Sequence, residues 1–419
     1  MQVTNALIYY ITKDNLSLNA VDKPGFRRFI KTVCPLYNCP HETQFTKLIH
    51  NKYETLKEAV RNRLRSTGSI CLTDVWTQMM NVKSYLGITG HFIHDFQLMS
   101  CLLGVIKCDQ SKTGAYIADL LLDCCNDWDI ELDNVSCVVT DNGANIVNAV
   151  KLQFGEKRHL PCFAHTLNLI ASKSVPLYNE AYGACLDPVI DSDDEDVDES
   201  DIDDAKHNSP EENMIIFIKK MKRIIKFFKK SETAMRELRK LQVIDGKKEC
   251  QCLMLILDVK TRWNSIMAMI ERFLLIAGYV SRVLLIIPKS PPMLTSDELS
   301  VLKEVCKTLK PLEKVTTEMS AEKYVTCSKI IPLVRLLKIS YGIMELESRE
   351  AFSLKQRILH FISKYFKDIE KVRILATATL LDPRFKKIHF ESALSASSAV
   401  FFVGRCNFSY FRPHSFMFF

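Results

Sequence analysis

The sequence predicts an α/β core built on a mixed sheet, followed by a large helical unit. Between about residues 67 and 180, short strand-like runs alternate with helical segments, which is the pattern of an α/β layer. From about residue 251 to residue 387, apolar residues recur at helical spacing, which indicates helices packed on one another. The chain is 419 residues long, so each of these parts is large enough to bury a core of its own.

The elements of the predicted core follow a lead-in that is helical over residues 1–66. Three strand-like runs come next and predict an antiparallel meander: residues 69–75, 85–93 and 97–105. A helix fits residues 113–125, and a β-branched run then predicts a fourth strand over residues 135–140, which stops at Asp141-Asn142-Gly143 before another helix. This order places Asp74 at the end of the first strand and Asp141 at the end of the fourth.

The second half of the chain opens with an acidic stretch that is too polar to bury a core, so we expect a disordered loop there. A basic amphipathic helix follows, with seven apolar side chains on one face: Met214, Phe217, Ile218, Met221, Ile224, Ile225 and Phe228. The sequence yields no fold for the last segment. We divide the chain into residues 1–66 (helical lead-in), 67–180 (first part of the core), 187–212 (acidic loop), 213–250 (basic helix), 251–390 (helical insertion and return to the core) and 391–419 (divergent tail).

Charge indicates a polyanionic partner. The net charge is +7, but residues 191–204 contain ten acidic residues and no Lys or Arg, so the rest of the chain carries +17. Nucleic acid is the first candidate for such a surface, and a merely basic protein is the alternative. Apolar runs fall short of the roughly 20 residues that a membrane span needs, and no secretory signal is evident, so we expect an intracellular protein. The fifteen cysteines are scattered through apolar segments, as reduced structural thiols usually are.

Two carboxylates are the candidates for chemistry. Asp74 and Asp141 each follow apolar strand residues, and strand ends are where open α/β sheets usually build sites. Two such acids suit Mg²⁺ or Mn²⁺, hard cations that bind carboxylate oxygens and activate phosphodiester chemistry. The alternative is that each acid only caps a helix or a turn.

Three further groups have two interpretations each. Cys162 and His165 have the spacing of metal ligands, but no matching pair is evident nearby, and a buried Cys with a hydrogen-bonded His is the alternative. Trp263 beside Arg262 suits stacking on an unpaired base, or else Trp263 is a core residue. The basic helix suits phosphate binding, a solvated face or a nuclear import signal. Its candidate DNA contacts are Lys219, Lys220, Lys222 and Arg223.

Taken in order, four strings resemble the hAT superfamily of transposases, and in particular the host-domesticated zinc finger BED domain-containing proteins. The four strings are Thr140-Asp141-Asn142-Gly143-Ala144-Asn145, Pro161-Cys162-Phe163-Ala164-His165-Thr166-Leu167-Asn168-Leu169, Thr261-Arg262-Trp263-Asn264-Ser265 and Thr379-Leu380-Leu381-Asp382-Pro383-Arg384-Phe385-Lys386. Pro24-Gly25-Phe26-Arg27-Arg28-Phe29 fits the segment that precedes the core in that group. The resemblance implies an RNase H-like fold with a helical insertion. It makes Asp74 and Asp141 the first two catalytic, metal-binding acids, Cys162 and His165 a supporting pair, and Trp263 the residue that stabilises a flipped base.

The sequence departs from the family at two points. The family's third acid, a Glu in a Ser-Glu-Arg string, has no counterpart in these residues, and no BED zinc finger is found. We therefore expect a nuclear, transposase-derived protein that binds DNA with low sequence specificity, holds Mg²⁺ or Mn²⁺ weakly and regulates transcription without cutting. It would have no membrane partner and no small-molecule substrate. An active hAT-type transposase is the alternative, and a protein-binding scaffold is another. We also expect that the chain forms a homodimer or a heterodimer with a full-length relative. A truncated gene product is a further possibility.

Overall fold

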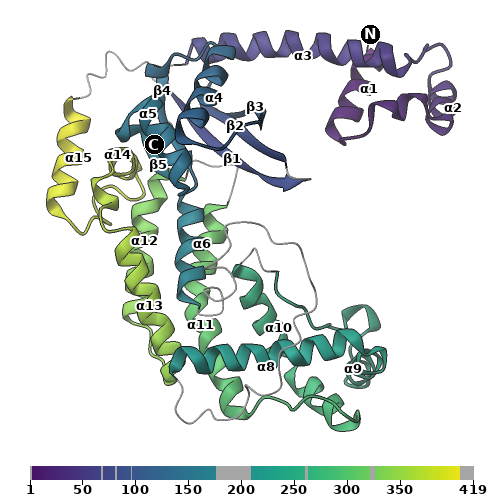
Figure 1. Ribbon diagram of the computed structural model, residues 1–419, viewed down its shortest axis with the longest axis vertical. Helices are drawn as coiled ribbons and strands as arrows, with labels where there is room; N and C mark the ends of the chain where they lie inside the picture. The colour runs from purple at the N-terminus through teal and green to yellow at the C-terminus, as the bar shows by residue number, and fades with distance from the viewer. Residues whose placement is uncertain are drawn as a thin grey trace.

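The computed structural model describes residues 2–67, 69–80, 83–95, 97–175, 209–259, 263–320 and 326–405, with backbone alone for 74–80 and 83. A mixed sheet lies between a helical N-terminal arm and a helical unit that extends away from the sheet (Figure 1). None of the described helices is long and apolar enough to cross a membrane. This is the α/β core with a second helical unit that the sequence predicts.

The N-terminal arm is helical, as predicted. It consists of α1 (Gln2–Lys13), the 3₁₀ turn η1 (Leu18–Asp22), α2 (Pro24–Val33) and the long helix α3 (Glu42–Arg65). A small apolar core of its own holds these helices together: Leu7, Ile11, Val21, Cys39 and Phe45. The far end of α3 is fixed to the core, because the Lys57 ammonium contacts the Asp127 carboxylate at 2.7 Å.

The sheet has five strands in the order β3-β2-β1-β4-β5. β1 (Ile70–Met80), β2 (Lys83–His94) and β3 (Gln97–Cys108) form the predicted antiparallel meander. β4 (Val135–Thr140) runs parallel to β1 and has the predicted bounds. The sequence did not reveal β5 (His159–Pro161), which pairs parallel with β4, because three residues are too few to show a period.

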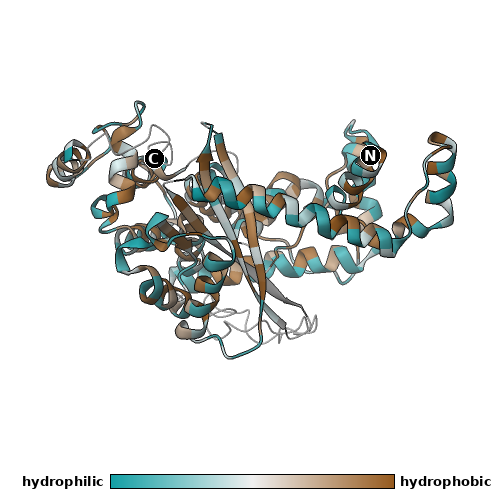
Figure 2. Ribbon diagram, turned by 90° about the horizontal axis from the view of Figure 1, so that it is seen from above, coloured by the Kyte–Doolittle hydropathy of each residue, from teal (hydrophilic) through white to brown (hydrophobic). Residues whose placement is uncertain are grey.

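The two faces of the sheet belong to different apolar clusters. On one face, α4 (Gly114–Asp127), α5 (Ala144–Phe154) and the end of α3 cover the strands, and Trp128 donates its indole N–H to the Leu103 carbonyl at 2.6 Å. On the other face, Cys137 and Leu160 join α6 (Phe163–Ser174) in a cluster that continues without a break into the helical unit. Hydropathy colouring shows brown stretches in the sheet and alternating teal and brown along the helices (Figure 2).

The helical unit begins with α8 (Pro210–Lys230) and α9 (Glu232–Ile244). All seven residues predicted for the apolar face of α8 are buried. Two predicted boundaries are wrong. Ser209 is the N-cap of α8 and Glu212 completes a capping box, so residues 210–212 belong to the helix rather than to the acidic loop. The basic segment 213–250 is two helices, because the chain breaks at Ser231, which caps α9. The loop before residue 209 lies outside the described residues.

The remaining helices are α10 (Trp263–Ile286), α11 (Ser296–Met319), α12 (Ile330–Gly342), α13 (Arg349–Tyr365), α14 (Arg373–Leu381) and α15 (Ala393–Arg405). Pro288 and Pro291-Pro292 lie between α10 and α11 and separate the two helices. The sequence offered no fold for the tail, but α15 is a helix whose Ala396 and Ala399 are buried. Residues 406–419 lie outside the described residues.

Asp382 fixes the end of α14 to the turn that precedes α12. Its carboxylate accepts hydrogen bonds from Ser328 Oγ at 2.8 Å and from Arg384 Nη2 at 2.6 Å, and Thr379 donates to the Ser328 carbonyl at 3.1 Å. The Asp382 side chain is 8% exposed. Hydrogen bonding to the Arg384 guanidinium holds the pKa of this carboxyl well below its usual range. The string around Asp382 therefore connects the end of α14 to the turn before α12.

We predict that Asp382→Asn lowers the free energy of unfolding by about 1–3 kcal/mol at neutral pH, because it removes charged hydrogen bonds from a buried site. A depressed carboxyl pKa stabilises the fold above the unfolded-state pKa, about 3.9, and this contribution is lost as pH falls further. Denaturant unfolding should therefore show a difference in unfolding free energy between the unmodified protein and Asp382→Asn, and this difference should narrow below about pH 4. Asp368→Asn, at an exposed ion pair with Lys371, is the control. Equal stability of the two variants would contradict this role.

Candidate functional site

Asp74 and Asp141 lie on neighbouring parallel strands. The β1–β4 register pairs Thr73 with Val139, so Asp74 is one residue beyond that pair and Asp141 directly follows the end of β4. The prediction that Asp74 ends its strand is wrong, because β1 continues to Met80 and Asp74 pairs with Ile88 of β2. Asp74 instead marks the point where β1 leaves β4 and continues with β2 alone.

The Asp141 carboxylate has a structural role in the turn into α5. Its Oδ1 accepts a hydrogen bond from the Gly143 backbone N–H at 2.9 Å. A Cβ at position 143 would lie 2.9 Å from that same oxygen, so a larger residue there would displace the Asp141 carboxylate from this position. The alternative that this acid caps a turn is therefore confirmed for Asp141. Asp141 is only partly buried.

The turn at Asp141 is joined directly to the start of α6. Cys162 donates its backbone N–H to the Thr140 carbonyl at 2.7 Å, and Asn142 Nδ2 donates to Thr166 Oγ1 at 3.2 Å. Thr166 in turn donates to the Cys162 carbonyl at 2.9 Å. Sequence reasoning did not single out Asn142 and Thr166 as the link between the two strings, since 24 residues separate them.

Cys162 and His165 stand at the beginning of α6. Cys162 directly precedes the helix, His165 is in its first turn, and both side chains are partly buried. Within the side chains that the structure describes, no three His, Cys, Asp or Glu residues gather as metal ligands would. The backbone hydrogen bond of Cys162 to Thr140 holds the start of α6 next to the end of β4.

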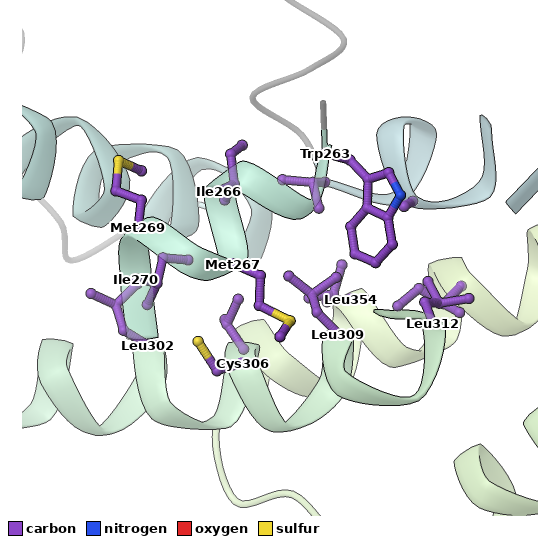
Figure 3. Close-up of a cluster of buried hydrophobic side chains, with 14 of the residues drawn as sticks. Trp263, Ile266, Met267, Met269, Ile270, Leu302, Cys306, Leu309, Leu312 and Leu354 are labelled. Atoms are coloured by element: carbon purple, nitrogen blue, oxygen red, sulfur yellow. The ribbon is translucent and has the colours of Figure 1, made fainter. Parts of the chain in front are cut away.

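Trp263 is a core residue. It begins α10 and is 4% exposed, and Figure 3 shows its indole ring among side chains of α11 and α13, including Leu309, Leu312 and Leu354. Trp263 is therefore not exposed for stacking on an unpaired base, and the alternative of a core Trp is confirmed. The physical reason is the large apolar area of the indole, which the helical unit buries. Arg262 lies outside the described residues.

The four predicted DNA contacts on α8 have different surroundings. Lys220 pairs with the Glu298 carboxylate at 2.8 Å and Lys222 with that of Asp258 at 2.7 Å, and these acids are 11% and 8% exposed. Both lysines therefore pair with largely buried carboxylates inside the helical unit, and their assignment as DNA contacts stays a prediction. Lys219 and Arg223 are exposed.

A stripe of exposed cations follows the outer side of α8. Lys219, Arg223, Lys226 and Lys230 are all exposed and recur at intervals of four, three and four residues, which places them on one side of the helix. The stripe is about 16 Å long at 1.5 Å per residue. Lys226 and Lys230 were not predicted as contacts, although their spacing from Lys219 was readable in the sequence. We call these four residues the α8 cation stripe.

Replacing Lys222 should destabilise the protein far more than replacing Lys219. Lys222→Ala leaves the Asp258 carboxylate without its cation in a nearly inaccessible position, which should cost about 1–3 kcal/mol of unfolding free energy. Lys219→Ala removes an exposed charge and should change stability by less than about 0.5 kcal/mol. Thermal and denaturant unfolding of the two variants compare them directly. Similar losses in both would show that the Lys222–Asp258 pair does not hold the helical unit.

Two family models match the chain in succession. Residues 72–165 match the ZBED1 RNase-like domain, and residues 160–308 match the ZBED1 RNase-like helical domain. The first region contains the sheet with Asp74 and Asp141, and the second begins at β5 and α6 and runs through α10 into α11. The two matches overlap at residues 160–165, which is where the Cys162–His165 segment joins the sheet to the helical unit.

Curated relatives include both regulators and transposases. Human zinc finger BED domain-containing protein 4 is 24% identical over 92% of this chain, and human zinc finger BED domain-containing protein 6 is 25% identical over 92%. The putative AC transposase of Zea mays is 24% identical over 89%. These matches span 30%, 37% and 43% of the relatives' own lengths. With its RNase-like core and helical unit, the chain is hAT-derived and is similar to the zinc finger BED domain-containing proteins.

Proposed function

We propose that these 419 residues bind DNA with low sequence specificity through the α8 cation stripe, and that the protein acts in the nucleus as a DNA- or chromatin-binding regulator. The stripe is the observation that carries the proposal. Four cations on one side of a rigid helix can follow phosphates along a backbone, and each neutralised phosphate releases counterions. Such contacts read no bases, so they give affinity without sequence preference.

The charge of the whole chain supports the same conclusion. Outside residues 191–204 the chain carries +17, which attracts a polyanion over distances longer than single contacts. The relatives' names agree in kind: one is a putative transcriptional regulator, tpeD of Talaromyces stipitatus, and others are transposases, among them the Drosophila melanogaster hobo transposase. A regulatory role in the nucleus is the function that combines a transposase-type fold with DNA affinity.

We further propose that these residues do not cut DNA by themselves. The support is in the sequence, where the Ser-Glu-Arg string that carries the family's third acid is not found among residues 1–419. Asp74 and Asp141 fit a hard cation such as Mg²⁺ or Mn²⁺ in donor type and in strand position. However, Asp141 Oδ1 already accepts the Gly143 N–H, which leaves fewer free lone pairs for an ion. A bound ion would supply Lewis-acid chemistry at a phosphodiester, and we expect it to be held weakly.

Replacing three lysines of the stripe tests the DNA surface. We predict that the triple variant Lys219→Gln, Lys226→Gln, Lys230→Gln weakens binding of a labelled duplex at least about tenfold and reduces the salt slope of log K by about 2–3. The control triple Lys364→Gln, Lys367→Gln, Lys371→Gln removes the same charge from exposed positions elsewhere. Fluorescence anisotropy at several salt concentrations measures both quantities. Equal losses in the two triples would exclude α8 as the interface, and no affinity at low salt would favour a protein-binding scaffold.

A nuclease assay tests the non-cutting part separately. The purified chain, incubated with duplex DNA and Mg²⁺ or Mn²⁺, should leave both strands intact. Cleavage that Asp74→Ala abolishes would overturn this part and establish the alternative, an active transposase with a two-metal acidic site.

A further inference from the structure

Two thiols lie in contact on the face of the sheet that the helical unit covers. Cys71 of β1 is paired with Cys137 of the parallel neighbour β4, and their Sγ atoms are 3.3 Å apart. Neighbouring strands are about 4.8 Å apart, which is within the range of about 4.4–6.8 Å that a disulfide needs between Cα atoms. The backbone therefore already has a spacing that a disulfide can span, and the sulfur atoms need to approach by only about 1.3 Å.

The surroundings of this pair are apolar and include a third thiol. Cys137 is 6% exposed and belongs to the cluster that joins the sheet to the helical unit, and the partly buried Cys71 packs against the same cluster. Cys327, in the 3₁₀ turn η6 (Cys327–Lys329) before α12, also packs there. Burial and the proximity of Cys137 raise the pKa of the Cys327 thiol to about 12. The pair therefore lies where the sheet meets the turn before α12.

The geometry of the pair fits a covalent bond better than a metal site. Two thiolates bound to one tetrahedral zinc ion, each about 2.3 Å from the metal, lie about 3.8 Å apart, and the ion needs four ligands in all. Cys71 and Cys137 are closer than that. Within the side chains that the structure describes, no group of three His, Cys, Asp or Glu residues could complete such a site. Oxidation is the chemistry that remains open to two thiols in contact.

We propose that Cys71 and Cys137 form a reversible disulfide by exchange with low-molecular-weight disulfides, of which oxidised glutathione is the type, and that this bond locks β1 to β4. Disulfides in a reducing compartment are usually transient and respond to the redox state, which fits a pair that the fold holds ready as thiols. The proposal does not rest on the proposed function, since it involves no residue of the α8 cation stripe.

The exchange proceeds in two steps. Cys71 is the more exposed of the two thiols, and its thiolate attacks one sulfur of the oxidant, so that a mixed disulfide forms and one glutathione leaves as its thiolate. The Cys137 thiolate then attacks the Cys71 sulfur, which forms the Cys71–Cys137 bond and releases the second glutathione thiolate. The two protons lost by the cysteines go to the two glutathione thiolates. Two electrons pass from the pair to the oxidant, and excess reduced glutathione reverses both steps.

Burial makes this exchange slow at neutral pH. Contact with the Cys137 thiol and burial raise the pKa of the Cys71 thiol well above its usual range. Only the thiolate attacks a disulfide, so the rate of exchange should increase as pH rises toward that pKa. The pair should therefore remain reduced during brief oxidation and become linked when oxidation is sustained.

The bond would stabilise the part of the sheet that carries the two predicted acids. Cys71 and Cys137 are 66 residues apart in the chain, and closing a loop of that length restricts the unfolded state far more than the folded one. Asp74 follows Cys71 by three residues and Asp141 follows Cys137 by four. The bond would therefore hold together the two strands that lead to Asp74 and Asp141, even when the helical unit is loosened.

Glutathione buffers test the proposal on the full chain. The protein is equilibrated at about pH 8 with different ratios of reduced to oxidised glutathione, alkylated, digested and mapped by mass spectrometry. A peptide that links Cys71 to Cys137 should appear. Its equilibrium constant should be at least about tenfold larger in the native chain than in the same chain unfolded in urea, because the fold holds the two sulfurs together. This ratio is measured on the unmodified chain, so it does not depend on whether a variant folds.

Serine variants identify the partners. Cys137→Ser should abolish the linked peptide, whereas Cys327→Ser, the matched control in the same apolar surroundings, should leave its equilibrium constant unchanged within about threefold. Oxidised protein should also unfold at a higher urea concentration than reduced protein, and Cys137→Ser should show no such shift. Absence of the linked peptide from the native chain, a native-to-unfolded ratio below about tenfold, or a bond of Cys71 to Cys327 in place of Cys137 would each overturn the proposal.

Discussion

Helix α6 belongs to two parts of the molecule at once, and the arrangement of the rest depends on it. Its first residues are hydrogen-bonded to the end of β4 through Cys162 and Thr166. Its apolar side, with Leu167, Ile170 and Ala171 fully buried, lies in the cluster that also contains Cys137 of β4 and the helices α8 to α13. Because one continuous apolar cluster crosses from the sheet to the helical unit, the two parts cannot separate without exposing it to water.

The strings that resemble the hAT family have one structural role in common, which is to hold neighbouring elements together. Asp141 closes the turn into α5, Cys162 joins that turn to α6, Trp263 anchors α10 in the helical core, and Asp382 ties α14 to the turn before α12. Each string stabilises a junction: Asp141 joins two consecutive elements, whereas Cys162, Trp263 and Asp382 contact elements that lie farther away in the sequence. The residues of these strings therefore have architectural roles, whereas the affinity for a polyanion that we propose would depend on exposed cations elsewhere, on α8.

The sequence allowed accurate prediction where a local period was strong. The apolar face of α8 and the bounds of β4 agree with the structure residue by residue, because helical spacing and a β-branched run act locally. The surroundings of Lys220, Lys222 and Trp263 could not be predicted, for one reason. Each depends on a partner distant in the chain, such as Glu298, which lies 78 residues from Lys220. Local sequence shows which side chains are charged or aromatic but not which of them tertiary packing will bury.

Native-state hydrogen exchange on a Leu167→Ala variant tests the shared cluster most directly. Leu167 is 0% exposed in α6, and its truncation should cost about 2–5 kcal/mol. If the sheet and the helical unit share one core, the opening free energies of amides in β4 and in α10 and α11 should fall together by a similar amount. Amides of α1, which pack in a separate cluster, should not change. A loss confined to the helical unit, with β4 unaffected, would contradict the account.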